Sequence, residues 1–177
     1  MQSLNQDVLL SGGSNLGKPI AQCQQVIQYL QQQAAVRLVA ISSLYLTEPV
    51  SPVEQGWFYN FALKLKTDLS PFDFLMLCQD IEKQFDRKRA EKWGPRSMDL
   101  DIIYYGSQII ESEDLVIPHQ HLAERKFVLI PLAEIAPEFI DPQRNKSISK
   151  ILRQTSDRHA VLLYEKKWFE TQAVVSL

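Results

Sequence analysis

Two stretches of the chain repeat apolar residues at the spacing of an amphipathic helix. The first begins near Pro19, which suits a first helical position, and carries the stripe Ile20, Cys23, Ile27, Leu30 and Ala34. The second follows Ser70-Pro71, a capping serine and a first-turn proline, and carries Phe74, Leu77, Ile81 and Phe85. Both stretches are predicted to be helices that bury one face, with Gln79, Glu82 and Asp86 on another face of the second.

Four other stretches have the short, apolar, β-branched or alternating character of strands. They span residues 7–11, 36–47, 58–67 and 98–105. Residues 58–67 alternate, so that Phe58 and Asn60 share one face while Phe61 and Leu63 share the other. Residues 12–15 are predicted to form a turn, and residues 47–57, which hold two prolines and a glycine, a loop.

The order of these elements is strand, helix, strand, strand, helix, strand. It predicts an α+β protein with a ferredoxin-like βαββαβ antiparallel sheet and both helices on one face. Over residues 116–139, Pro118, Pro131 and Pro137 interrupt the patterns, and we expect short strands and turns. A short helix over 147–154 and a final strand over 160–164 complete these C-terminal additions. We treat residues 1–177 as a single domain.

Composition narrows the classes of function. The 177 residues are 45% hydrophobic and 23% charged, which suits one globular domain, and the formal net charge is −2. This balance gives no global attraction to nucleic acid or to an anionic membrane. The N-terminus lacks a signal-peptide pattern, and no run is apolar enough to span a bilayer. Cys23 and Cys78 lie in helical patterns, as buried thiols do in a reducing compartment, so we expect a cytoplasmic protein.

The sharpest chemical signal is the pair Asp99 and Asp101, two residues apart in a predicted strand. Strand side chains repeat every two residues, so both carboxylates point to one face, roughly 7 Å apart. Carboxylates this close raise each other's ionisation cost, and a divalent cation removes that cost. Magnesium takes one or two carboxylates together with substrate phosphates, and this spacing could serve two ions. The alternative is a half-solvated edge strand with two harmless acids.

Five cations precede the acidic pair within ten residues: Arg87, Lys88, Arg89, Lys92 and Arg96. Carboxylates for metal beside arginines for phosphate oxygens suit a nucleoside triphosphate. Trp93 lies in the same segment, where a stacking or lid role competes with simple packing against the base of the loop. Gly94 and Pro95 are typical of a loop that closes over substrate. A solvated charge run and a nucleic-acid surface are the alternatives for these cations.

Other candidate residues are less specific. The amide of Asn60 could match the edge of a heterocycle or bond to a loop, and His119 could bond a phosphate or cap a turn. The segment GGSNLGKP is similar to a phosphate-binding P-loop, but Pro19 stands where that motif needs a hydroxyl, so a tight strand-to-helix turn is favoured. The aromatic pattern of RNA recognition motifs, the other common use of a βαββαβ sheet, is missing from the sequence.

Together these segments resemble the hydroxymethyldihydropterin pyrophosphokinase family of the folate pathway. The run KWGPRSMDLDII at 92–103 carries most of the resemblance. GSNLG at 13–17, SSLYLTEP at 42–49, FYNFALKLKT at 58–67, VIPH at 116–119 and RKFVLIPLAEIAPEF at 125–139 follow in the family's order. The resemblance covers roughly residues 7–155, and the tail over 160–177 is longer than in compact members and carries no motif.

The resemblance implies an ATP-dependent diphosphotransferase that gives AMP and the diphosphate of 6-hydroxymethyl-7,8-dihydropterin. It implies that Asp99 and Asp101 hold two Mg²⁺ ions bound with ATP, and that Arg96 and Trp93 complete the catalytic set. Asp99 is the candidate general base. The implied pterin-binding residues are Thr47, Pro49, Val50, Phe58, Asn60, Trp93 and Phe127. The implied ATP-binding residues are Gln79, Glu82, Arg87, Lys88, Arg89, Lys92, Arg96, Ile102, His119 and Arg125.

We expect the partners to be ATP and the pterin, with no nucleic acid and no membrane, and we expect a monomer. A degenerate member that binds pterin or nucleotide without catalysis is the remaining alternative. Intact Arg96, Asp99 and Asp101 argue against it.

Overall fold

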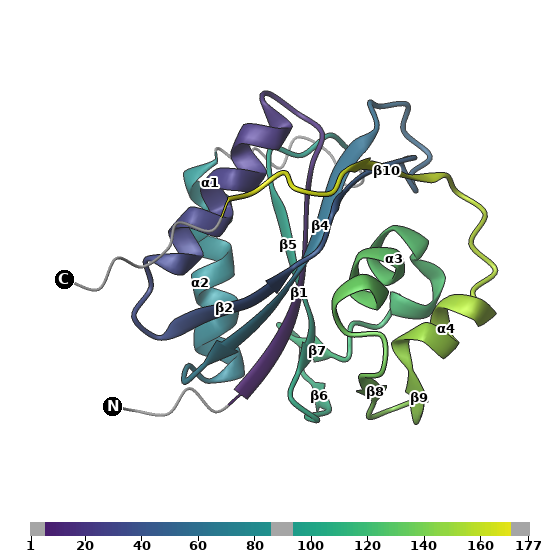
Figure 1. Ribbon diagram of the computed structural model, residues 1–177. Coiled ribbons are helices and arrows are strands. Elements are labelled where there is room, and N and C mark those ends of the chain that lie inside the picture. The colour runs from purple at the N-terminus through teal and green to yellow at the C-terminus, as the bar shows by residue number, and fades with distance from the viewer. Residues whose placement is uncertain (1–5, 86–93, 171–177) are drawn as a thin grey trace.

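The computed structural model describes residues 6–85 and 94–170, and its centre is one antiparallel sheet with helices on both faces (Figure 1). The strands of the sheet are β1 (Gln6–Ser14), β2 (Val36–Ile41), β3 (Leu44–Thr47), β4 (Phe58–Thr67), β5 (Asp99–Tyr105) and β10 (Val161–Glu165). The helices are α1 (Pro19–Gln31), α2 (Pro71–Gln84), α3 (Lys126–Ile135), α4 (Ile148–Gln154) and the 3₁₀ turn η1 (Leu122–Glu124). Two small hairpins pair β6 (Ile110–Glu111) with β7 (Val116–Ile117) and β8 (Ile140–Asp141) with β9 (Lys146–Ser147).

The strand order is β10-β3-β4-β1-β5. β2 and β3 pair with the same edge of β4, β3 with its N-terminal part and β2 with its C-terminal part. The predicted antiparallel sheet of a mixed α/β protein is therefore confirmed. The single strand expected over 36–47 is wrong, because the chain divides into β2 and β3 at Ser42 and Ser43. There the Ser42 hydroxyl accepts a hydrogen bond from the Ala62 amide at 2.8 Å, so a side chain replaces a backbone carbonyl as the partner of β4.

The two faces of the sheet bury separate cores. α1 and α2 lie on one face, over a cluster that includes Leu10, Phe61 and Leu63 (Figure 1). α3 and α4 lie on the other face, over a cluster that includes Leu9 and Tyr104. The expectation that helices cover one face therefore holds for α1 and α2 only, because the C-terminal additions form a second layer. That layer covers only part of its face, and the uncovered part carries the site described below.

The turn expected over residues 12–15 begins later than predicted, because Gly12, Gly13 and Ser14 continue β1. Gly12 and Gly13 pair with β4 on one side and with β5 on the other. Glycine is unusual in a central strand, but here neighbouring side chains fill the space that its missing Cβ leaves. A Cβ on Gly12 would overlap the ring of Phe61, and a Cβ on Gly13 would overlap the Asn60 side chain.

Residues 116–139 were expected to hold short strands and turns, and α3 contradicts this. Pro131 lies inside this ten-residue helix. Proline removes a helical hydrogen bond and is read as a helix breaker. Burial of Val128, Leu129 and Leu132 against the sheet compensates for the lost bond, and no local pattern reports that tertiary contact. The expected helix over 147–154 and final strand over 160–164 are confirmed as α4 and β10.

Cys23 and Cys78 are free and buried, as predicted. Burial raises the pKa of both thiols, so both are neutral at physiological pH. In the part of the chain that the structure describes, no helix has the length and apolar character needed to cross a bilayer.

Candidate active site on the open face of the sheet

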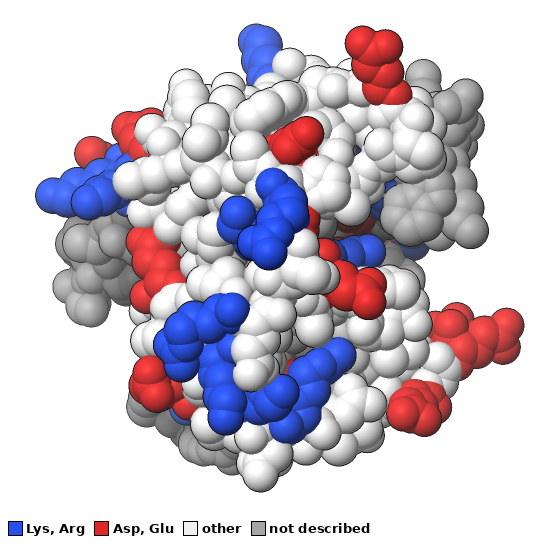
Figure 2. Space-filling model, turned by 90° about the vertical axis from the view of Figure 1, so that its right-hand side faces the viewer, with Lys and Arg blue, Asp and Glu red and all other residues white. Residues whose placement is uncertain are grey.

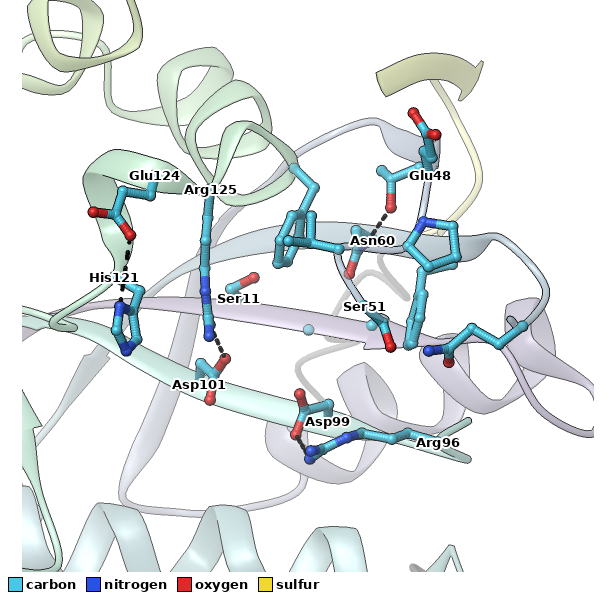
Figure 3. A pocket seen from close by; sticks show the side chains of 18 of the residues that line it. Ser11, Glu48, Ser51, Asn60, Arg96, Asp99, Asp101, His121, Glu124 and Arg125 are labelled. Carbon is cyan, nitrogen blue, oxygen red and sulfur yellow. Dashed lines mark hydrogen bonds and ion pairs between the residues drawn. The ribbon is translucent and has the colours of Figure 1, made fainter. Parts of the chain in front are cut away.

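A cavity of about 260 Å³ lies where the second helical layer leaves the sheet uncovered (Figure 3). Its floor comes from β1, β4 and β5, one wall from the end of β3 and the following loop, and the other wall from η1 and the start of α3. On the side of the molecule that carries α3 and α4, acidic and basic side chains meet at a hollow in the surface (Figure 2). Two groups of side chains line the cavity. Pro49, Val50, Phe58 and Phe127 form what is here called its apolar end, and Arg96, Asp99, Asp101 and Arg125 form its charged end.

Strand register decides which side chains form the floor. Gly13 on β1 lies opposite Asn60 on β4 and Asp99 on β5, and Ser11 lies opposite Asp101. Alternation then turns Ser11, Asn60 and both carboxylates to the same face, away from α1 and α2. The prediction that the two acids share a face is confirmed, and the structure shows that this face lies opposite α1 and α2.

The two carboxylates are each balanced by an arginine (Figure 3). Arg96 Nη1 donates to Asp99 Oδ1 at 2.9 Å, and Arg125 Nη1 donates to Asp101 Oδ2 at 3.4 Å. Burial and the neighbouring Asp99 charge raise the pKa of Asp101, and Arg125 opposes this only in part. The two arginines therefore leave the acidic pair incompletely neutralised, which is the state that a bound cation would relieve.

His119 lies beside the same group, with Nε2 4.0 Å from Asp101 Oδ2. Burial and the charge of Arg125 lower the pKa of His119 to about 4. Its imidazole is therefore neutral near pH 7 and can exchange a hydrogen bond with a ligand without adding charge.

The carboxylate pair fits a metal that arrives with its substrate. Among the described residues there is no cluster of three His, Cys, Asp or Glu side chains that could hold a metal without other ligands. Magnesium usually needs only one or two carboxylates when waters and phosphate oxygens fill the rest of its shell. Asp99 and Asp101 face an open cavity that leaves room for those ligands.

At the apolar end of the cavity, the amide of Asn60 is held in one orientation. Its Nδ2 donates to Thr47 Oγ1 at 2.6 Å, and the residue is only 5% exposed. Gly13 makes room for the Asn60 carbonyl, since any side chain there would overlap it. Asn60 is therefore a fixed donor–acceptor pair at the edge of an apolar pocket, the arrangement that recognises a flat heterocycle.

The cavity gathers most of the predicted site residues that the structure describes. Those lining it are Thr47, Pro49, Val50, Phe58, Asn60, Arg96, Asp99, Asp101, Arg125 and Phe127. Arg87, Lys88, Arg89, Lys92 and Trp93 lie outside the described residues.

Four described residues expected to bind ATP do not line the cavity: Gln79, Glu82, Ile102 and His119, which lies beside Asp101. Gln79 is exposed on α2, and Ile102 is buried in the core beneath that helix. Glu82 is 4% exposed and accepts a hydrogen bond from the Leu100 amide at 2.9 Å, which ties α2 to β5. Their role toward ATP stays a prediction.

The cavity also includes residues that sequence reasoning did not single out: Ser11, Glu48, Ser51, Gln55, His121 and Glu124. Ser11 could have been found from the strand pattern, because it lies two residues before Gly13 on the same face. The others come from the loop after β3 and the turn before α3, where no periodic pattern indicates which side chains face inward.

The comparisons with known proteins agree on one family. Residues 9–137 match the family model described as 7,8-dihydro-6-hydroxymethylpterin-pyrophosphokinase (HPPK). The chain is 42% identical over 135 residues to the 2-amino-4-hydroxy-6-hydroxymethyldihydropteridine pyrophosphokinase of Bacillus subtilis. The match covers 76% of this chain and 81% of that protein. It is 37% identical over 151 residues to the protein of the same name from Haemophilus influenzae, covering 85% and 94% of the two chains.

Among solved structures, the wild-type HPPK-DHPS of Plasmodium falciparum with pteroate resembles the chain with a TM-score of 0.68 at 14% identity. The match covers 84% of this chain but only 42% of the solved one, so the chain spans less than half of that protein. At this level of identity, the likeness shows a shared fold.

Proposed function

Because this chain belongs to the 7,8-dihydro-6-hydroxymethylpterin-pyrophosphokinase family, we propose that it transfers the diphosphate of ATP to the hydroxymethyl oxygen of 6-hydroxymethyl-7,8-dihydropterin. The products are AMP and the pterin diphosphate, a step of folate biosynthesis. The observation that carries the proposal is the cavity in which the fixed amide of Asn60 and the Asp99–Asp101 pair share one face of the sheet.

The pterin would occupy the apolar end of the cavity. The Asn60 amide would pair with the polar edge of the ring, in the orientation that Thr47 sets. Phe127 would stack on the ring from the start of α3, with Arg125 5.9 Å from the centroid of Phe127. Trp93 would cover the opposite face of the ring. The remaining apolar walls come from Pro49, Val50 and Phe58.

ATP would occupy the charged end, with its phosphates over the carboxylate pair. Asp99 and Asp101 would hold two Mg²⁺ ions, which would supply charge neutralisation to the phosphates. Arg96 and Arg125 pair with these carboxylates in the structure, and cations bound there would free both guanidiniums for phosphate oxygens. The neutral imidazole of His119 would add a hydrogen bond to ATP. Gln79, Glu82, Ile102 and the basic residues Arg87, Lys88, Arg89 and Lys92 complete the proposed ATP site.

In this reaction the protein contributes positioning of the substrates and neutralisation of charge, and it forms no covalent intermediate. A bond forms between the hydroxymethyl oxygen and the β-phosphorus of ATP, and the bond from that phosphorus to the oxygen bridging the α-phosphate breaks, so that AMP leaves. The hydroxyl proton passes to Asp99, the carboxylate on the β5 floor nearer the pterin end. Arg96 and Arg125 stabilise the charge on the transferred group.

Two finer points of organisation belong to this proposal. We propose that β1, β4, β5 and the β2–β3 edge, with α1 and α2, form a ferredoxin-like βαββαβ core to which β10 is added. The strand order and the placement of both helices support this. We also propose that the protein acts as a monomer, because one chain supplies both ends of the cavity.

The proposal is tested by product analysis. Purified protein with ATP, magnesium and 6-hydroxymethyl-7,8-dihydropterin should form AMP and the pterin diphosphate in equal amounts, and chelation of magnesium should stop the reaction. Formation of ADP instead of AMP, or no turnover of the pterin, would contradict the proposal.

A further inference from the structure

The segment Thr155–Trp168, here called the C-terminal strap, lies beyond residues 9–137 that match the family. It leaves α4, forms β10 along the edge of β3 and crosses toward α1 (Figure 1, yellow). Its far end is fixed in the core. Trp168 is 4% exposed, donates from Nε1 to the Ser42 carbonyl at 2.9 Å and packs on Phe61.

The strap supplies the N-terminal cap of α3. Arg125, at the N-cap position of that helix, makes no side-chain capping hydrogen bond. Asp157 takes this role from the strap, because its Oδ2 accepts a hydrogen bond from the Lys126 amide at 2.8 Å. The Asp157 side chain is 4% exposed, and Oδ1 accepts a hydrogen bond from the His159 amide at 2.9 Å. A carboxylate at this position satisfies a helical amide and complements the helix dipole.

A second contact joins the strap to the turn just before α3. The Thr155 hydroxyl donates to the Ala123 carbonyl at 2.8 Å. Arg125 lies between these two contacts, Phe127 directly follows the second, and both residues line the cavity. Thr155 and Asp157 therefore fix one wall of the cavity.

The same strap holds the opposite wall. The Glu48 amide donates to the Ala160 carbonyl at 2.9 Å, and the Ala160 amide donates to Glu48 Oε2 at 2.9 Å. Val161 then pairs with Thr47, the residue that orients Asn60. Asp157 and Ala160 lie only three positions apart along the chain, so one short stretch of the strap contacts both walls.

We infer that the C-terminal strap sets the separation of the two walls of the pterin subsite, with Asp157 as its positioning residue. The inference rests on the proposed function, because it assigns the pterin to this end of the cavity. Without the Asp157 cap, the first turn of α3 can move, and with it the ring of Phe127. Arg125 is held additionally by its ion pair with Asp101, and its backbone amide donates a hydrogen bond to the Leu122 carbonyl at 3.1 Å. The pterin end should therefore suffer more than the ATP end.

The test compares full-length Asp157→Ala with the wild-type enzyme in steady-state assays that vary each substrate separately. We expect the KM for the pterin to rise about tenfold, the effect of one lost charge-assisted hydrogen bond, and the KM for ATP to change by less than about twofold. Asp157→Asn keeps an oxygen acceptor for the Lys126 amide and should restore most of the wild-type pterin KM.

Ser147→Ala is the matched control. Ser147 caps α4 by accepting a hydrogen bond from the Lys150 amide at 3.2 Å, and it does not line the cavity. This variant should lower the melting temperature by an amount similar to Asp157→Ala and leave both KM values unchanged. If Asp157→Ala does not fold, Thr155→Val takes its place, because it removes the bond to Ala123 and should raise the pterin KM selectively.

An unchanged pterin KM in a folded Asp157→Ala or Thr155→Val enzyme would overturn the inference, as would equal increases in both KM values. If the wild-type chain makes no AMP, the proposed function fails. The strap is then judged by fluorescence titration of the pterin with a non-hydrolysable ATP analogue and magnesium present. About tenfold weaker binding to Asp157→Ala than to wild type supports the inference. Equal binding, or no binding to either protein, overturns it.

Discussion

At the scale of single residues, the cavity depends on small groups in which one side chain fixes the orientation of another or balances its charge. Thr47 fixes the Asn60 amide, and Arg96 and Arg125 balance Asp99 and Asp101. The sequence alone indicated Asn60 and the acidic pair, because a polar residue in a strand is conspicuous. It did not indicate the Thr47–Asn60 bond, since this contact joins residues 13 positions apart through a strand pairing that no local pattern reports.

The acidic pair gives the first prediction. Asp99→Ala and Asp101→Ala should each lower kcat at least about 100-fold, because each removes charge that would hold metal and phosphate in place. AMP formation at saturating substrate measures the effect. Asp114→Ala is the control, because Asp114 is an exposed acid that does not line the cavity. Near-normal turnover of either test variant would remove that carboxylate from the metal site.

Gly13 gives the second prediction. Gly13→Ala should raise the KM for the pterin about tenfold, because the new Cβ overlaps the Asn60 side chain and turns the amide from its position. Stability should fall by only about 0.5–1.5 kcal/mol, because the displaced amide loses its hydrogen bond to Thr47. Gly56→Ala is the matched control, because a Cβ there meets no atom within 4 Å. A wild-type pterin KM in Gly13→Ala would argue against Asn60 as the pterin contact.

At the scale of elements, what the sequence predicted and what it missed follow from how local each pattern is. β4 and β5 were predicted closely, because alternation over residues 58–67 and the spacing of Asp99 and Asp101 are complete within one strand. The end of β1 and the whole of α3 were missed. Gly12 and Gly13 locally disfavour a strand, and Pro131 locally disfavours a helix. Packing within the sheet and against its second helical layer outweighs these local preferences.

The packing of β1 against β4 gives the third prediction. A Cβ on Gly12 would enter the ring of Phe61, which is fully buried beneath α1 and α2. Gly12→Ala should therefore lower the free energy of unfolding by about 1–3 kcal/mol, the cost of overpacking a core, as measured by urea denaturation. The pterin KM of the folded fraction should stay within about twofold of wild type. Together, Gly12→Ala and Gly13→Ala distinguish the role of the core face of β1 from the role of its cavity face. Wild-type stability of Gly12→Ala would contradict the packing described.

At the scale of the whole molecule, the C-terminal layer turns a two-layer sheet into a site with walls. α3 and α4 bury part of the second face, and the strap closes the β3 edge and joins the walls of the cavity. The sequence predicted α4 and β10 as elements, but it gave no indication of where they pack. The segments that meet here, such as Lys126 and Asp157, lie 31 positions apart.

The strap also gives a pH-dependent prediction. Burial acts to raise the pKa of Asp157, but hydrogen bonds from His159 and Lys126 outweigh it, so the pKa lies below its usual 3.8. A carboxylate with a lowered folded-state pKa stabilises the protein above its unfolded pKa and loses this contribution as pH falls through the folded value. Wild type should therefore be more stable than Asp157→Asn at pH 7, and the difference should shrink below about pH 3.8. Urea midpoints measured across this range test it, and a difference independent of pH would contradict it.

The most direct test of the whole account is a crystal structure of the protein with magnesium, a non-hydrolysable ATP analogue and 6-hydroxymethyl-7,8-dihydropterin. The account predicts metal bound by Asp99 and Asp101, with the pterin edge on the Asn60 amide and its ring against Phe127. Arg96 and Arg125 should have left the carboxylates for phosphate oxygens. A pterin bound elsewhere, or phosphates bound away from Asp99 and Asp101, would contradict the account.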